Sequence, residues 1–286
     1  MTTAKLYSIE GTELKSISLP EQFEEEVNQD LIKRAVITVQ QNSRQKYGAF
    51  EEAGKRSSAK LSKRRKRYRG SYGKGISRVS RKIMWRRGSQ FGWEGAFAPG
   101  TRGGRKAHPP KMEKSFVIKI NKKERRKAIR SAIAATAIKD LVSVRHKIQR
   151  PVPIILESKF ESLSRTKQIK ELLLKLGLKE ELERISKKKI RAGKGKKRNR
   201  KYRIKKGPLI VFSAPCPLEK ASRNLQGIET SLVENLNAGL LAPSAVPGRL
   251  VIWSENAIQK MEKEKLFTNN QVKKENGDTL KNKKQR

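Results

Sequence analysis

The run PVPIILES, residues 151–158, decides the fold class of this chain. It is a short, continuous apolar run that follows prolines, and such runs are typical of strands buried on both faces of a parallel sheet. Two more runs, PLIVFS at residues 208–213 and LVIWS at residues 250–254, have the same character. Because parallel strands need helices on both faces of their sheet, these runs predict an α/β domain with a mainly parallel sheet flanked by helices.

Helical patterns stand between these strands, as an α/β domain requires. Asn121 and Glu124 form a cap pair related to the capping box and open a helix. Residues 165–185 predict two further helices divided by Gly177, and Ser254 is placed to cap a last helix. Shorter patterns predict a helix over residues 219–226 and a weaker strand over residues 227–233. The helix that Asn121 and Glu124 open has an apolar stripe, which comprises Ile129, Ala132, Ile133, Thr136, Ala137, Leu141 and Val144.

The N-terminal region supplies the remaining elements of the same domain. Alternating residues around a glycine turn predict a hairpin over residues 5–19, and helical spacing follows from Leu31 to about Gln41. We therefore expect residues 1–43 and 114–267 to form the globular α/β domain, with a basic insertion at 184–207. Residues 268–286 read as a disordered tail.

Residues 44–113 lack apolar periodicity and consist of Gly, Lys, Arg, Ser and separated aromatic residues. Such a segment cannot bury enough apolar surface to fold alone, so its composition predicts disorder in the free protein. A long loop without regular structure inside a domain marks a functional or a disordered segment. We interpret it as a functional extended loop, and the insertion at 184–207, which has no acidic residue, as a second one.

The charge of the chain indicates a polyanionic partner. Lys and Arg number 69 against 27 Asp and Glu, which leaves a formal charge of +42 on 286 residues. Such a charge repels itself unless nucleic acid or an anionic membrane neutralises it. No run approaches eighteen apolar residues and no signal-like segment opens the chain, so we expect nucleic acid, no membrane and a cytoplasmic location.

Residue counts disfavour catalysis. Cys216 is the single cysteine, and the two histidines and three aspartates are far apart in the sequence. GKGK and GSYGKGIS complete no phosphate-binding fingerprint, so we expect no metal, no cofactor and no enzyme activity. His146 reads as a cation at a helix end, Cys216 as a small buried residue at a strand end, and Trp253 as core.

Aromatic residues among the basic residues favour RNA over simple phosphate neutralisation, because aromatic and arginine planes stack on unpaired bases. The aromatic residues are Tyr47, Phe50, Tyr68, Tyr72, Trp85, Phe91, Trp93 and Phe97. The predicted RNA-binding residues are Lys63, Arg64, Arg65, Lys66, Arg67, Arg69, Tyr72, Lys74, Arg78, Arg81, Lys82, Trp85, Arg86, Arg87, Phe91, Trp93, Arg102, Arg105, Lys106, His108 and Lys111 in the loop, and Arg191, Lys194, Lys196, Lys197, Arg198, Arg200, Lys201 and Arg203 in the insertion.

Several segments, taken in order, resemble one family. They are GSYGKGISRVSR, EGAFAPGTRGGRKAHPPK, NKKERRKAIRSAIAATA, IRAGKGKKRNRKYRIKKGPLIVF and GRLVIWSENAI. The chain resembles the large-subunit ribosomal protein four family in its archaeal and eukaryotic branch, up to about Phe267. That family's loop-tip motif falls on residues 72–81, with Ser80 where the family usually has proline.

The resemblance implies a structural constituent of the large ribosomal subunit that binds ribosomal RNA, assists subunit assembly and extends a loop to the wall of the polypeptide exit tunnel. It makes Tyr72, Lys74, Arg78 and Val79 the tunnel-proximal residues. It further implies neighbouring ribosomal proteins as partners, including large-subunit protein twenty-two near the tunnel. The protein would be a monomer within the ribosome, in the cytoplasm.

Two alternatives remain open from the residues alone. A non-ribosomal nucleic-acid-coating protein would satisfy the charge, although internal basic insertions with aromatics argue against it. An RNA-modifying enzyme would use the insertions to hold its substrate, although no catalytic cluster is present in the sequence. Preference for structured RNA over duplex DNA, and a rate assay with candidate cofactors, would separate the three.

Overall fold

The computed structural model describes residues 2–67, 70–88 and 90–269, which fall into two units. Unit 1 comprises residues 1–43 and 118–286, and unit 2 comprises residues 44–117. The three continuous apolar runs lie in unit 1, whereas the basic segment without apolar periodicity is unit 2. No helix among the described residues is both long and apolar enough to cross a bilayer.

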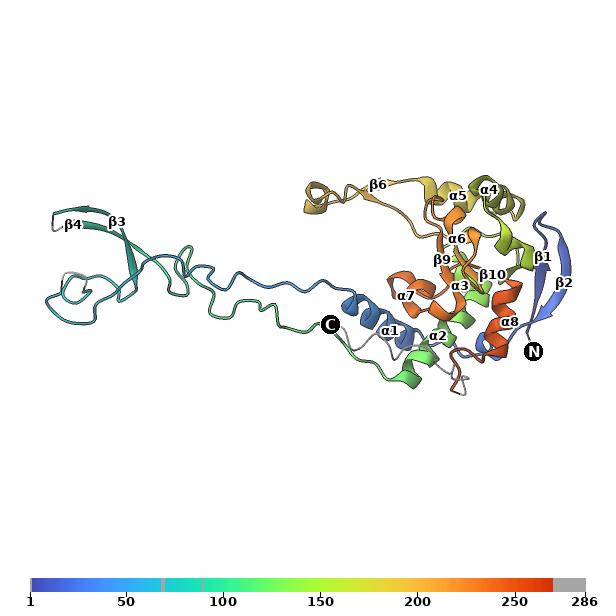
Figure 1. Ribbon diagram of the computed structural model, residues 1–286, viewed down its shortest axis with the longest axis horizontal. Helices are drawn as coiled ribbons and strands as arrows, with labels where there is room; N and C mark the ends of the chain where they lie inside the picture. The colour runs from blue at the N-terminus through green and yellow to red at the C-terminus, as the bar shows by residue number, and fades with distance from the viewer. Residues whose placement is uncertain (1, 68–69, 89, 270–286) are drawn as a thin grey trace, which may run out of the picture. The chain divides into compact units, whose positions relative to one another are not determined.

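A six-stranded sheet forms the centre of unit 1 (Figure 1). Only the pairing of β1 with β2 is antiparallel, and the other four pairings are parallel. The predicted fold class is therefore confirmed, as are the N-terminal hairpin and the buried strands. In spatial order the strands are β2 (Glu13–Ser18), β1 (Thr3–Tyr7), β5 (Ile154–Leu156), β10 (Val251–Ser254), β8 (Leu209–Phe212) and β9 (Glu229–Leu232).

The apolar strands are buried on both faces because successive side chains of a strand point to opposite faces. In β5, Ile155 packs into one hydrophobic cluster, while Ile154 and Leu156 pack into the other. In β10, Trp253 packs into the same cluster as Ile155, and Ile252 packs into the cluster of Ile154 and Leu156. This two-sided burial is why the sequence of each strand is continuously apolar and does not alternate.

Helices cover both faces of the sheet (Figure 1). The apolar stripes of α1 (Gln29–Asn42), α2 (Lys122–Ala137), α7 (Ala238–Leu241) and α8 (Glu255–Lys263) pack with Trp253. On the other face lie α3 (Lys139–Ser143), α4 (Thr166–Lys175), α5 (Lys179–Ser186) and α6 (Pro217–Ser222). Short 3-10 turns are η1 (Glu21–Phe23), η2 (Ser158–Ser162), η3 (Lys194–Arg198), η4 (Val233–Asn235) and η5 (Pro243–Ala245).

The structure confirms one of the two predicted helix caps. Ser254 caps α8 as predicted, because its Oγ accepts a hydrogen bond from Ala257 N at 3.1 Å. Asn121 stands at the N-cap position of α2, but its side chain accepts no capping hydrogen bond. The helix predicted to continue to Val144 is broken at Ile138, whose ψ of 111° is extended backbone. Val144 is consequently 80% exposed and not part of the apolar stripe.

Unit 1 closes on itself at the two points where unit 2 leaves it. Asn42 Nδ2 donates to Ile118 O at 3.2 Å, and Ile118 N donates to Asn42 Oδ1 at 2.9 Å. At the C-terminal end, Thr268 is buried and its carbonyl accepts a hydrogen bond from Arg126 Nη1 at 3.2 Å, so this first residue of the expected tail belongs to the fold. The expected tail from residue 270 onward lies outside the described residues.

Candidate nucleic-acid interface

Unit 2 begins and ends with two runs of chain that pass each other in opposite directions. Ala49 N donates to Pro110 O at 2.9 Å, and the rings of Tyr47 and Phe116 stack with 5.4 Å between their centroids. A side chain on Gly48 is excluded, because a Cβ there would lie 2.7 Å from Met112 N. Contacts between the two runs thus replace an apolar core.

Between these runs lies an antiparallel hairpin that the sequence analysis did not predict. Strands β3 (Arg81–Arg87) and β4 (Gln90–Gly95) pair from Arg81 with Gly95 to Arg87 with Gln90. Most of its side chains are charged or aromatic, and the apolar Ile83 and Met84 are adjacent in sequence, which hides the alternation that marks a half-buried strand. Trp85 lies over Gly92, where the absence of a side chain makes room for the indole.

Cations of unit 2 lie over its aromatic rings. Arg56 lies 4.2 Å from the centroid of Phe50, Arg78 lies 5.1 Å from Tyr72, and Arg86 lies 5.3 Å from Phe91. Such pairs hold a guanidinium group close to an aromatic ring, where the ring and the cation attract each other. A nucleic acid would therefore meet planar cations and rings together.

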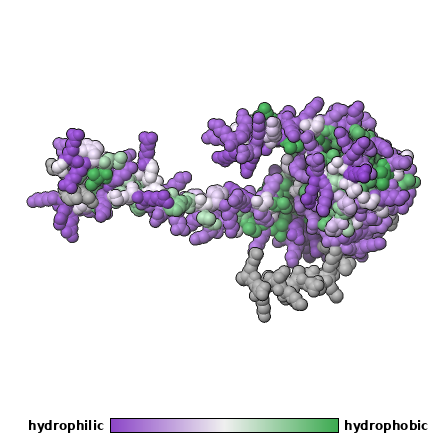
Figure 2. Space-filling model, turned by 45° about the horizontal axis from the view of Figure 1, so that its top comes forward, coloured by the Kyte–Doolittle hydropathy of each residue, from purple (hydrophilic) through white to green (hydrophobic). Residues whose placement is uncertain are grey.

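The described loop residues predicted to bind RNA are exposed or part-exposed, and none is buried. The part-exposed ones are Arg81, Lys82, Phe91, Trp93 and Arg105, and Val79 at the predicted tip is also part-exposed. Arg69 lies outside the described residues. Figure 2 shows hydrophilic residues over most of the visible surface of both units.

Sequence reasoning missed the contribution of the two ends of unit 2. Arg44, Tyr47 and Phe116 form one cluster, with the Arg44 guanidinium 5.2 Å from the Tyr47 centroid and 4.7 Å from that of Phe116. The interleaving of aromatics identified Tyr47, but Phe116 stands 69 residues later and shares no local pattern with it. Only the pairing of the two runs brings these residues together.

The second basic segment, residues 184–207, holds 14 Lys and Arg and no acidic residue. Its strands β6 (Lys189–Ile190) and β7 (Tyr202–Arg203) pair antiparallel around the turn η3. Arg191 Nε donates to Arg200 O at 3.0 Å, which fixes one cation against the hairpin. The predicted RNA-binding residues from Arg191 to Arg203 are all exposed.

Arg184 links the two ends of this segment, where it leaves unit 1. Its Nη2 donates to Lys206 O at 2.9 Å, and its Nε and Nη2 donate to Glu181 at 2.7 and 2.6 Å. The Glu181 carboxylate, whose side chain is fully buried, also lies 2.6 Å from His146 Nδ1. Burial alone would raise the pKa of Glu181, but hydrogen bonds from Arg184 and His146 outweigh it and lower the pKa to about 2.

The interpretation of His146 as a cation at a helix end is wrong. Its side chain is fully buried against Glu181, and burial lowers its pKa despite the hydrogen bond to that carboxylate. At neutral pH the imidazole is therefore uncharged and donates its Nδ1 proton to Glu181. His146 belongs to the support of the basic segment and not to the candidate interface.

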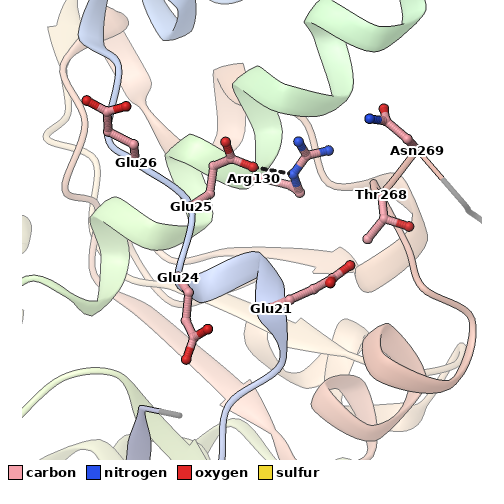
Figure 3. Close-up of a pocket in the computed structure, with 7 residues that line it drawn as sticks. All are labelled: Glu21, Glu24, Glu25, Glu26, Arg130, Thr268 and Asn269. Carbon is pink, nitrogen blue, oxygen red and sulfur yellow. Dashed lines mark hydrogen bonds and ion pairs between the residues drawn. The ribbon is translucent and has the colours of Figure 1, made fainter.

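Acidic residues gather in a separate cavity of unit 1, of about 440 Å³ (Figure 3). Figure 3 shows Arg130 directed at Glu25, and its Nε donates to that carboxylate at 2.7 Å. The other lining residues are Glu21, Glu24, Glu26, Thr268 and Asn269. Carboxylates repel phosphate, so this cavity lies outside the candidate interface.

Among the described residues, no three His, Cys, Asp or Glu side chains are grouped so that they could hold a metal ion. The interface is thus a set of exposed cations and aromatic rings without a metal-binding cluster in the described parts of the chain. Such an arrangement neutralises phosphates and stacks on bases.

Comparison with known proteins places this arrangement in a family. A family model described as ribosomal protein L4/L1 family matches residues 17–264. A large ribosomal subunit protein uL4 from Nanoarchaeum equitans is 51% identical over 264 residues, which cover 92% of this chain and 98% of the relative. Proteins of the same name from Methanosphaera stadtmanae and Methanococcus maripaludis strain S2 are 41% and 43% identical, over 91% and 90% of this chain and 96% and 97% of the relatives.

The family model matches residues 17–43 and 118–264 of unit 1, which include the insertion at 184–207, and the whole of unit 2. The resemblance drawn from the sequence motifs is therefore confirmed, and the relatives are archaeal. This chain belongs to the ribosomal protein L4/L1 family.

Proposed function

We propose that this protein is a structural constituent of the large ribosomal subunit and binds ribosomal RNA through unit 2 and the segment 184–207. Its relatives of 41–51% identity carry the name of a large-subunit ribosomal protein and align over most of their length. The role is architectural and requires no catalysis.

One observation carries the proposal: unit 2 is a charged structure without a core. It has 22 Lys and Arg against 4 Glu, and Ala96 is the only buried hydrophobic residue among its described residues. A segment of this kind is stabilised when a polyanion neutralises its cations and covers its rings. RNA fits better than duplex DNA, because RNA presents unpaired bases to aromatic side chains.

The finer parts of the proposal follow the family resemblance. Unit 2 extends toward the wall of the polypeptide exit tunnel, with Tyr72, Lys74, Arg78 and Val79 nearest to it. Large-subunit protein twenty-two is a neighbour there, and the protein assists early assembly of the subunit. It acts as a monomer within cytoplasmic ribosomes.

The test is crosslinking in native lysate fractionated on a sucrose gradient, with both the protein position and the nucleotide mapped. We expect sedimentation with the large subunit and crosslinks from residues 63–111 and 191–203 to ribosomal RNA. Purified protein should bind structured large-subunit RNA more tightly than duplex DNA at matched salt. Absence from ribosomal fractions, or equal binding of both nucleic acids, would overturn the proposal.

A further inference from the structure

Unit 2 contains a cavity of about 870 Å³ beside its two antiparallel runs. We call it the Tyr47 cleft. It is lined by Tyr47 from the outgoing run and by Ala107, His108, Pro109, Pro110, Lys111, Glu113, Lys114 and Phe116 from the returning run. It is therefore formed by the ends of unit 2 and is distinct from the hairpin β3–β4.

An aromatic wall lines the cleft. The ring planes of Tyr47 and Phe116 lie 19° apart, and Lys114 Nζ lies 5.7 Å from the Phe116 centroid. Arg44 contacts both rings, so the stack is bordered by cations. A planar, cation-bordered apolar surface is the kind of surface on which a nucleobase stacks beside its phosphate.

The backbone beside the cleft is constrained before any ligand binds. Pro109 and Pro110 fix their own φ angles, and the carbonyl of Pro110 accepts the hydrogen bond from Ala49. Gly48 allows the chain at Met112 to approach closely. The cleft is thus held open by its own contacts, which lowers the entropy cost of filling it.

The cleft leaves a large aromatic surface uncovered. Tyr47 is 51% exposed although it already stacks on Phe116. Its neighbours are mainly cationic, which favours a ligand with a negative charge and a flat face. Glu113 disfavours phosphate at its own position, so a phosphate would be bound at the side of Lys111 and Lys114.

We propose that the Tyr47 cleft binds one unpaired nucleobase of RNA, stacked on the Tyr47 ring, while Lys111 and Lys114 bind the adjoining phosphates. This inference rests on the proposed RNA-binding function and adds a specific site to it. A base within a helix is covered on both faces by its neighbours, so the site selects bases outside helices. Bulged, looped or flipped nucleotides are the ligand class.

The test measures the affinity of the full chain for two probes at matched salt, an oligouridylate of about 12 nucleotides and an RNA duplex of about the same length. Tyr47→Ala should weaken oligouridylate binding about 5- to 150-fold, which is the stacking contribution of one base, and leave duplex binding nearly unchanged. Tyr47→Leu, which keeps apolar volume without a π face, should lose affinity, whereas Tyr47→Phe should retain it. Photocrosslinks from thiouridine should map to Tyr47 or Phe116.

A matched control is available in the other basic segment. Tyr202 is 50% exposed and has Lys201 Nζ at 5.6 Å from its ring, but it lines none of the cavities described above. Tyr202→Ala should change oligouridylate affinity far less than Tyr47→Ala. Lys111→Ala should weaken both probes and reduce the slope of log affinity against log salt by about 0.7 to 0.9, which a pure stacking variant should not do.

The outcomes separate the two proposals. If Tyr47→Ala changes neither probe, or both equally, while Lys111→Ala still acts, the cleft is not a base site and the RNA-binding function stands. If the unmodified protein binds neither RNA in a salt-dependent manner, the RNA-binding function fails and the inference fails with it. Competition by oligoglutamate as effective as by oligouridylate would assign the cleft to an acidic peptide and overturn the inference.

Discussion

Substitution of Glu181 by Gln should destabilise unit 1 far more than the same substitution one residue earlier. Glu181 is fully buried and accepts two hydrogen bonds from Arg184, one from His146 and one from Lys147 N at 3.1 Å. Gln keeps the size of the side chain but removes its charge and turns one acceptor into a donor that faces Arg184. The perturbation therefore acts on the charge and leaves the packing volume unchanged.

The magnitude follows from the lowered pKa of Glu181. The pKa of Glu181 falls from 4.5 to about 2, and at about 1.4 kcal/mol for each unit of pKa this difference equals about 3 to 4 kcal/mol. Removal of one partner from a buried ion pair costs a similar amount, about 3 to 5 kcal/mol. We expect Glu181→Gln to lower the free energy of unfolding by about 3 kcal/mol.

Urea unfolding followed by circular dichroism near neutral pH measures this loss. An unchanged slope of unfolding free energy against urea concentration would show that the unfolded state is unaltered. The control is Glu180→Gln on the same helix. Glu180 and Lys147 pair at 3.3 Å with both side chains more than half exposed, so this pair should contribute about 0 to 1 kcal/mol. Equal losses of unfolding free energy for the two variants would refute the assignment of Glu181 as the buried charge that stabilises the two ends of residues 184–207.

Three further outcomes are expected. The unfolding free energy should fall as the pH drops below about 6.5, because the pKa of His146 is lowered in the folded state and the unfolded state therefore binds its proton at a higher pH. Urea unfolding at several pH values should show this dependence of the unfolding free energy on pH, and His146→Gln should reduce it. Ser254→Ala should cost about 1 to 2 kcal/mol, measured by thermal unfolding, because it removes the cap on Ala257 N, and restoration by Ser254→Thr is the check. Gly92→Ala should displace the indole of Trp85, since a Cβ there would lie 2.5 Å from Trp85 Cε2; the tryptophan emission should shift, and a Trp85→Phe background that still shifts would contradict this.

The α/β fold was predictable because its strands are buried on both faces. Ile154 and Trp253 stand in continuous apolar runs, and the period of the helices between them is unambiguous. The break at Ile138 was not predictable, since the apolar spacing continues through it while the backbone turns. His146 was misinterpreted because its partner Glu181 is 35 residues away, and local sequence carries no sign of that contact.

The candidate interface was predictable in composition but not in geometry. Charge and aromatic content identified residues such as Arg78 and Trp93, because a segment without apolar periodicity leaves its side chains exposed. The hairpin β3–β4 was missed, since Ile83 and Trp85 alternate with no aliphatic partner strand that would mark a buried face. Its formation depends on cross-strand pairing that propensity alone does not report.

The double hydrogen bond between Asn42 and Ile118 has a consequence for how this protein can change over evolution. It ties the ends of a 74-residue insertion together inside unit 1. The insertion therefore affects the folding free energy of unit 1 mainly through the entropy of closing a loop. That entropy grows only logarithmically, and doubling the length of the insertion adds about 0.6 kcal/mol. The length of unit 2 is therefore nearly neutral for the stability of its host fold, and natural selection on that length would come from the RNA proposed as the partner of unit 2.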